Sequence, residues 1–136
     1  MILGIGTDMV EIARMAALLA RHPHGPARHI LAPGELDDWR TAEDPARFLA
    51  KRFAVKEAFA KALGTGLRAP AVLPAIALEH DALGKPRLVL ADALVDYLRV
   101  RGVTRHHVSL SDERLYALAF VVLEGADAAS PLETTS

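Results

Sequence analysis

The sequence has no cysteine, few aromatic residues and no surplus of positive charge, and each absence excludes a class of protein. Without cysteine there can be no disulfides, thiolate nucleophiles or sulfur-ligated zinc, which fits a reducing compartment. Aromatic residues make up 5% of the chain, too few for a platform that stacks nucleic-acid bases. The 16 Lys and Arg stand against 17 Asp and Glu, for a net charge of −1. We therefore expect no nucleic-acid partner.

Long apolar runs are also missing, since none approaches the roughly 20 residues that a membrane helix needs. The first residues lack the basic start of a signal peptide. These absences predict a cytoplasmic protein with no membrane partner. The 136 residues, 51% of them hydrophobic, suit one folded domain with a buried core. We place that domain at residues 1–125 and expect the small, polar tail at 126–136 to be disordered.

Apolar periodicity and the positions of Gly and Pro predict short strands mixed with helices. In chain order, the expected elements are a buried strand at 1–5, helices at 10–21, 33–39 and 45–63, strands at 75–80 and 86–90, a helix at 93–101, and strands at 107–111 and 115–124. Asp44-Pro45 starts the longest helix and Gly64 ends it. This order predicts an α+β domain with a mainly antiparallel sheet and helices packed on one face. Because helices are expected on one face only, part of the other face of the sheet is left for other subunits to cover.

The longest helix carries an apolar stripe, with Glu57 and Lys61 on the opposite side. Arg52 and Lys56 fall at or near the stripe, where charged residues are unexpected. Two interpretations remain open for them: a position at a subunit boundary, or stems buried with the charges turned outward.

Two short segments carry candidate chemistry. Asp8 precedes a predicted helix, so its ordinary interpretation is an N-cap, with Glu11 at a capping-box spacing. Glu57 and Lys61 are four residues apart, as in a solvent-exposed ion pair. The alternative is that Glu57 joins a second carboxylate on Mg²⁺ while Lys61 faces phosphate, since Mg²⁺ takes only one or two protein carboxylates.

Four motifs, taken together in chain order, resemble a known family. They are Gly-Ile-Gly-Thr-Asp at 4–8 with Glu11 and Arg14 after it, Phe-Leu-Ala-Lys-Arg-Phe-Ala-Val-Lys-Glu-Ala-Phe-Ala-Lys-Ala-Leu-Gly-Thr-Gly at 48–66, Gly-Lys-Pro at 84–86, and His-Val-Ser-Leu-Ser-Asp at 107–112. The chain resembles the holo-acyl-carrier-protein synthases, the small bacterial 4′-phosphopantetheinyl transferases, across residues 1–124.

The resemblance implies a Mg²⁺-dependent transfer of phosphopantetheine from coenzyme A to a serine of apo acyl carrier protein, with release of adenosine 3′,5′-bisphosphate. It also implies a homotrimer with sites at subunit boundaries. The implied roles fall on Asp8 and Glu57 for the metal, on Glu57 and Lys61 for catalysis, on Arg52, Lys61, Gly64, Lys85, Pro86 and Arg87 for coenzyme A, and on Arg14, Arg21 and Arg28 for docking of the acidic carrier protein.

The general base stays open, because Asp112 stands where many relatives carry histidine. Glu57 or a metal-bound water could accept the serine proton. Two other functions are also compatible with the residues. One is a non-catalytic module that binds carrier protein. The other is a different Mg²⁺-dependent phosphoryl-transfer enzyme, such as a phosphatase or a nuclease, and the net charge disfavours the nuclease.

Overall fold

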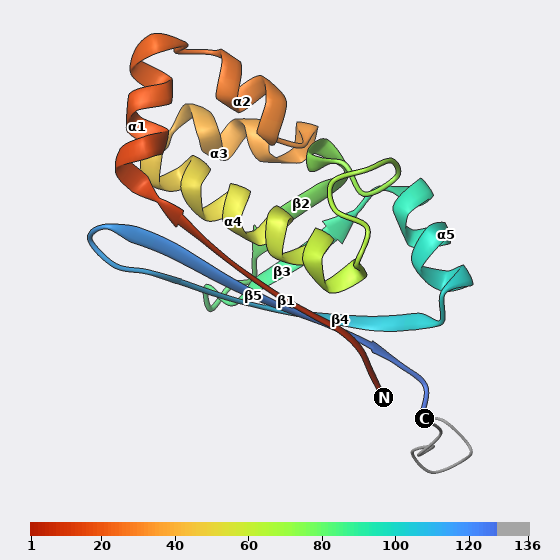
Figure 1. Cartoon of the computed structure of the whole chain (residues 1–136). Coiled ribbons are helices and arrows are strands. Elements are labelled where there is room, and N and C mark those ends of the chain that lie inside the picture. Colours follow the sequence, from red (N-terminus) through yellow and green to blue (C-terminus); the bar gives the residue numbers. More distant parts are fainter. Residues whose placement is uncertain (128–136) are drawn as a thin grey trace.

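A long helix lies across a three-stranded antiparallel sheet in the computed structural model, which describes residues 1–127 (Figure 1). The sheet has the order β1-β5-β4, with β1 at Ile2–Glu11, β5 at Tyr116–Gly125 and β4 at Val103–Asp112. A separate hairpin pairs β2 (Ile76–His80) with β3 (Pro86–Leu90). The predicted α+β class and antiparallel pairing are confirmed, although the strands form two sheets. Tail residues 128–136 lie outside the described residues, so the predicted disorder there stays a prediction.

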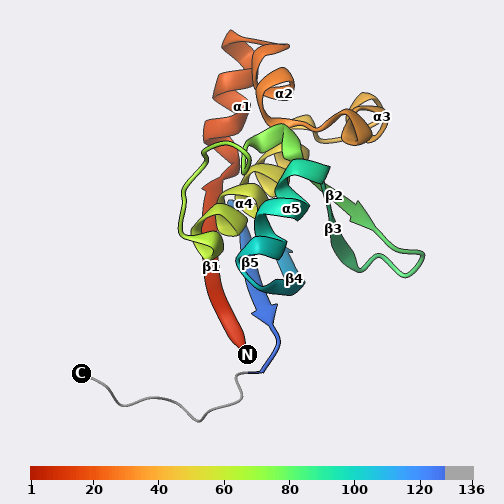
Figure 2. The same cartoon turned by 90° about the vertical axis from the view of Figure 1, so that its right-hand side faces the viewer.

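All helices lie on one side of the three-stranded sheet, as predicted (Figure 1). They are α1 (Ile12–Arg21), α2 (Gly25–Ile30), α3 (Leu36–Arg40), α4 (Pro45–Leu63) and α5 (Asp92–Val100), with short 3₁₀ turns η1 (Pro33–Glu35) and η2 (Leu73–Ala75). No helix within residues 1–127 is long and apolar enough to cross a membrane. Figure 2 shows the β2–β3 hairpin projecting away from the rest of the molecule.

The ends of α4 are set by local sequence. The Asp44 side chain accepts a hydrogen bond from the backbone N–H of Arg47, and Pro45 occupies the first turn. Gly64 ends the helix in the left-handed region, at φ +82°, which glycine adopts without a steric penalty. The predicted bounds of this helix are therefore confirmed.

The apolar side of α4 packs on the sheet and forms the main core. Val55 and Phe59 are fully buried there, against Val121 and Leu123 of β5. Because strand side chains alternate between the faces, the neighbouring Leu118 and Phe120 point away from the helices and remain 45% and 43% exposed. Ile5 and Met9 of β1 are also exposed, at 56% and 60%. These four residues form the open sheet face, an apolar surface that no helix within residues 1–127 covers.

Two glycines let β1 approach α4 very closely. A Cβ atom placed on Gly4 would lie 1.9 Å from the carbonyl oxygen of Ala62, and one on Gly6 would lie 1.9 Å from that of Ala58. Any side chain at either position would therefore overlap the helix backbone. Sequence reasoning missed this role. The available signal was two glycines on one face of a strand and two alanines one helical turn apart.

The sequence prediction for the N-terminal strand is wrong in two respects. The strand is not buried along its length, and it runs on to Glu11 because β5 pairs with it as far as Tyr116. Asp8 consequently lies inside the strand, opposite Ala119, and does not cap α1. The N-cap of α1 is Glu11, whose side chain makes no capping hydrogen bond. Long-range pairing with β5 overrides the local capping signal.

Candidate active site

Asp8 and Lys61 meet where β1 crosses α4. The Lys61 Nζ atom lies 2.9 Å from Asp8 Oδ1 and donates a second hydrogen bond, at 3.1 Å, to the carbonyl oxygen of Thr7. The Asp8 side chain is 17% exposed and the Lys61 side chain 53%. Glu57 precedes Lys61 by one helical turn, so the two project from the same side of α4. The structure thus brings together three predicted site residues, two carboxylates and one ammonium.

The Glu57 carboxylate is the member of this group that has no partner among residues 1–127. Within residues 1–127 it forms no hydrogen bond and no ion pair, whereas Asp8 is paired with Lys61. Partial burial raises the pKa of Glu57, the negative charge of Asp8 raises it further, and Lys61 opposes both effects. Carboxylates whose pKa is perturbed by burial and by a neighbouring charge are enriched at functional sites.

A cavity of about 300 Å³ opens beside these carboxylates. Asp8 and Glu57 line it together with Arg14 of α1 and an apolar wall that includes Phe53 and Leu18. Arg14, predicted from the resemblance as a docking residue, therefore faces the same space as the predicted metal ligands. Arg21 and Arg28 are exposed, and none of these three arginines forms an ion pair with any residue that the structure describes.

Other predicted residues lie away from this cavity within the single chain. Lys85, Pro86 and Arg87 belong to the projecting hairpin, where Arg87 pairs with Glu79 at 3.1 Å (Figure 2). Gly64 lies one turn after Lys61, at the end of α4.

Arg52 and Lys56 are buried in an ionic cluster around Glu35, which neither sequence interpretation anticipated. Lys56 is fully buried and donates to the Glu35 carboxylate and to the carbonyl oxygen of Ile30. Arg52 Nε lies 3.0 Å from the other Glu35 oxygen, and its guanidinium stacks over the Phe48 ring. Burial lowers the pKa of both cations, and the Glu35 charge opposes this. Neither charge is turned outward, so that interpretation is wrong.

The cluster also changes the interpretation of Arg52 as a coenzyme A ligand. Its side chain is only 5% exposed and is occupied by Glu35, so the structure does not bring it to Asp8 and Glu57. Glu35 itself was missed. It joins three elements, because its oxygens also accept the backbone N–H groups of Ala32 and Leu78. The available signal was the pair of cations on an apolar helix face, which requires a buried anion nearby.

Asp112 is paired with α4 and does not line the cavity beside Glu57. Its carboxylate accepts a hydrogen bond from Arg47 at 2.8 Å and lies 3.5 Å from Lys51. Partial burial raises the pKa of Asp112, but Arg47 and Lys51 outweigh burial and hold the pKa below its ordinary value. A carboxylate held in this way is a poor proton acceptor near neutral pH.

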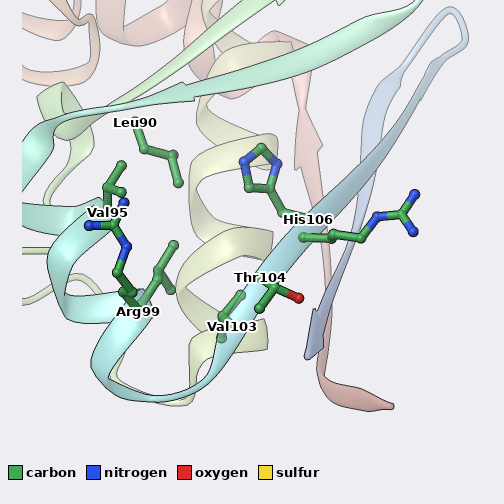
Figure 3. Close-up of a pocket in the computed structure, with 8 residues that line it drawn as sticks. Leu90, Val95, Arg99, Val103, Thr104 and His106 are labelled. Carbon is green, nitrogen blue, oxygen red and sulfur yellow. The ribbon is translucent and has the colours of Figure 1, made fainter. Parts of the chain in front are cut away.

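A second cavity, of about 310 Å³, lies between α5 and β4 and contains none of the predicted site residues. Figure 3 shows Arg99 and Val95 together on the α5 side of it and His106 on the β4 side. Burial and the nearby His107 lower the pKa of His106, which favours the neutral ring. This cavity has no carboxylate in its lining, so it offers no acidic pair for a divalent cation.

Two carboxylates and a lysine beside a cavity suit a phosphoryl transferase, because phosphoryl transfer relies on positioning and charge neutralisation. The chain belongs to the 4′-phosphopantetheinyl transferase superfamily, whose sequence model matches residues 4–121. It is 63% identical to the holo-[acyl-carrier-protein] synthase of Laribacter hongkongensis, over 92% of this chain and 100% of that protein. The family predicted from the motifs is confirmed, and with it the transferase class.

Solved structures show the same fold. The crystal structure of the holo-[acyl-carrier-protein] synthase from Neisseria meningitidis aligns with a TM-score of 0.88 at 47% identity, over 91% of this chain and 99% of that one. A holo-(acyl-carrier-protein) synthase from Bacillus anthracis, in complex with CoA (3′,5′-ADP), aligns with a TM-score of 0.77 at 31% identity, over 93% and 99% of the two chains.

Proposed function

We propose that this chain transfers the 4′-phosphopantetheine arm of coenzyme A to a serine of apo acyl carrier protein, with Mg²⁺, and releases adenosine 3′,5′-bisphosphate. The observation that carries the proposal is the group formed by Asp8, Glu57 and Lys61 beside the cavity. Membership of the superfamily and the relatives named as holo-[acyl-carrier-protein] synthases support it. The absence of cysteine agrees with a cytoplasmic enzyme.

The residues fit a magnesium ion. Hard carboxylate oxygens are the ligands that Mg²⁺ prefers, and Mg²⁺ completes its shell with water and phosphate oxygens. Within residues 1–127 there is no group of three or more His, Cys, Asp or Glu side chains that could hold a metal. Asp8 and Glu57, which line the same cavity, would be its two protein ligands. When bound, Mg²⁺ would neutralise charge that develops on the diphosphate during transfer.

Lys61 and Glu57 would act directly on the reacting groups. The Lys61 ammonium is half exposed and can neutralise a phosphate oxygen at the mouth of the site. Glu57 lines the cavity beside the reacting groups, which supports it as the acceptor of the serine proton. The pairing of Asp112 with Arg47 argues against Asp112 in that role.

The carrier protein would dock on the arginines of the N-terminal helices. Arg14, Arg21 and Arg28 are exposed, and Arg14 also lines the cavity that holds the carboxylates. An acidic carrier protein bound here would present its serine near Glu57. Such a contact increases the encounter rate and weakens as salt screens the charges.

We further propose a homotrimer in which protomers bury the open sheet face. Ile5, Met9, Leu118 and Phe120 expose an apolar surface of the kind that marks subunit contacts. A subunit boundary next to the site would let Lys85, Pro86 and Arg87 of one protomer contact coenzyme A held by another. Light scattering should give a trimer at micromolar concentration, and a monomer would contradict this part of the proposal.

Mass spectrometry of the carrier-protein reaction tests the function. Apo acyl carrier protein, coenzyme A and Mg²⁺ should give a product heavier by one phosphopantetheine arm. Glu57→Gln should abolish conversion while the protein stays folded, and Glu43→Gln, at an exposed site on the loop before α4, should react like the original chain. No conversion of any of several bacterial carrier proteins would instead favour a non-catalytic binding module.

A further inference from the structure

The resting site already contains a cation bound to one of its two carboxylates. Lys61 Nζ lies 2.9 Å from Asp8 Oδ1 and is also held by the carbonyl oxygen of Thr7, 3.1 Å away. Glu57, by contrast, has no ion-pair or hydrogen-bond partner within residues 1–127. The ammonium is therefore bound to a carboxylate that it would have to share with a divalent cation at Asp8 and Glu57.

We infer that Lys61 is an internal competitor for the metal site, and that it couples divalent-cation binding to binding of the diphosphate. The inference rests on the proposed function. An ammonium and a divalent cation on one carboxylate repel each other, so the metal alone binds against the Lys61–Asp8 pair. A diphosphate offers the ammonium a new anionic partner and removes that obstacle.

The structure allows Lys61 to change partners. Its side chain is 53% exposed, on a flexible four-carbon stem at the solvent side of α4, whereas Asp8 is only 17% exposed and is held in a paired strand. The lysine can therefore leave while the carboxylate stays in place. By linkage, whatever the diphosphate adds to metal affinity, the metal adds equally to diphosphate affinity.

A different role for Lys61 predicts the opposite result. If Lys61 only orients Asp8 for the metal, its removal would disorder a ligand and weaken metal binding. If it competes with the metal, its removal would strengthen binding of the metal alone. The sign of the change in affinity separates these two roles.

The test measures Mn²⁺ binding by electron paramagnetic resonance of the free ion, with no carrier protein present, so that no turnover occurs. Lys61→Met is compared with the original chain, in the absence and in the presence of coenzyme A, with a correction for Mn²⁺ bound to the coenzyme in solution. Lys51→Met is the matched control, because Lys51 also forms a lysine–aspartate pair from α4, with Asp112 at 3.5 Å.

We expect Lys61→Met to bind Mn²⁺ alone roughly twofold to fivefold more tightly, which is the range expected for the loss of one partly exposed ion pair. The increase in Mn²⁺ affinity caused by coenzyme A should be smaller in Lys61→Met than in the original chain. Lys51→Met should match the original chain in both measurements.

Equal or weaker Mn²⁺ binding by Lys61→Met would overturn the inference while leaving the proposed function intact. Asp8→Asn separates a failure of this inference alone from a failure of the proposed metal site. If Asp8→Asn leaves Mn²⁺ binding unchanged, the metal is not at Asp8, and both this inference and the proposed metal site are wrong. Carrier-protein modification, measured separately, decides whether the transferase function itself stands.

Discussion

The contact between β1 and α4 that holds Asp8 beside Lys61 depends on the absence of a side chain at Gly6. In a Gly6→Ala variant, the new Cβ atom would lie 1.9 Å from the Ala58 carbonyl oxygen and 2.6 Å from the Ala62 nitrogen. Both atoms belong to the helix backbone, so no rotamer change can relieve the overlap. The strand and the helix would have to separate by about 1 Å to reach even a tight contact of 3.0 Å.

The size of the effect follows from that separation. Overpacking of a well-packed core costs about 1–3 kcal/mol, and for a chain of this length we expect the thermal midpoint to fall by about 4–15 °C. The same movement displaces Asp8, two residues after Gly6, relative to Glu57, the residue before Ala58. Because a misplacement of about 1 Å can cost about 100-fold in rate, kcat should fall about 100-fold.

Thermal unfolding and the carrier-protein assay together check this reasoning. Gly34→Ala is the matched control, since a Cβ atom there meets nothing within 4 Å. It should keep the original midpoint and rate. Replacing Ala58 by glycine should not rescue Gly6→Ala, because the overlapping atom is a backbone oxygen. A Gly6→Ala protein with the original midpoint and rate would refute the close-approach argument.

Three further changes test other parts of the structure. Glu57→Gln should raise the thermal midpoint at pH 7, because burial and Asp8 raise the pKa of Glu57 and its ionised form therefore destabilises the native state. In thermal scans this gain should disappear below the ordinary pKa of a glutamic acid. A gain that persists in acid would contradict the reasoning. Lys56→Met leaves the Glu35 carboxylate buried without the Lys56 ammonium and should lower the free energy of unfolding in urea by about 3 kcal/mol. Adding Glu35→Gln should recover part of this loss. No recovery would argue against the pair. Asp112→Asn should leave kcat unchanged but lower the thermal midpoint at pH 7. The pKa of Asp112 is lowered in the native state, so its ionised form stabilises that state above the pKa of the unfolded chain, and this contribution is lost in acid. A large fall in kcat would make Asp112 a candidate base again.

Local signals in the sequence predicted several elements correctly. The bounds of α4 follow from Asp44, Pro45 and Gly64, each of which acts on the backbone within a few residues of itself. The β2–β3 hairpin likewise follows from its turn, where Gly84 adopts a φ of +86° and the Asp81 carboxylate accepts backbone hydrogen bonds from Leu83 and Lys85.

Features that depend on distant residues were predicted incorrectly or missed. Asp8 looked like a helix cap because its partner strand, β5, lies more than 100 residues later in the chain. Arg52 and Lys56 looked misplaced on an apolar face because their counter-ion, Glu35, belongs to a different element. In both cases the local pattern is present in the sequence, but a contact with a distant residue determines the structure that forms there.

The sequence alone determined the bounds of α4, the exclusion of cysteine chemistry and the motifs that identify the superfamily, because these depend on residue type and short spacing. Only the tertiary structure decided which charges meet. Lys61 and Asp8 are 53 residues apart and pair because Gly6 lets a strand lie directly against a helix. Charge pairing depends on separation in space, and separation in space becomes known only once the backbone is folded.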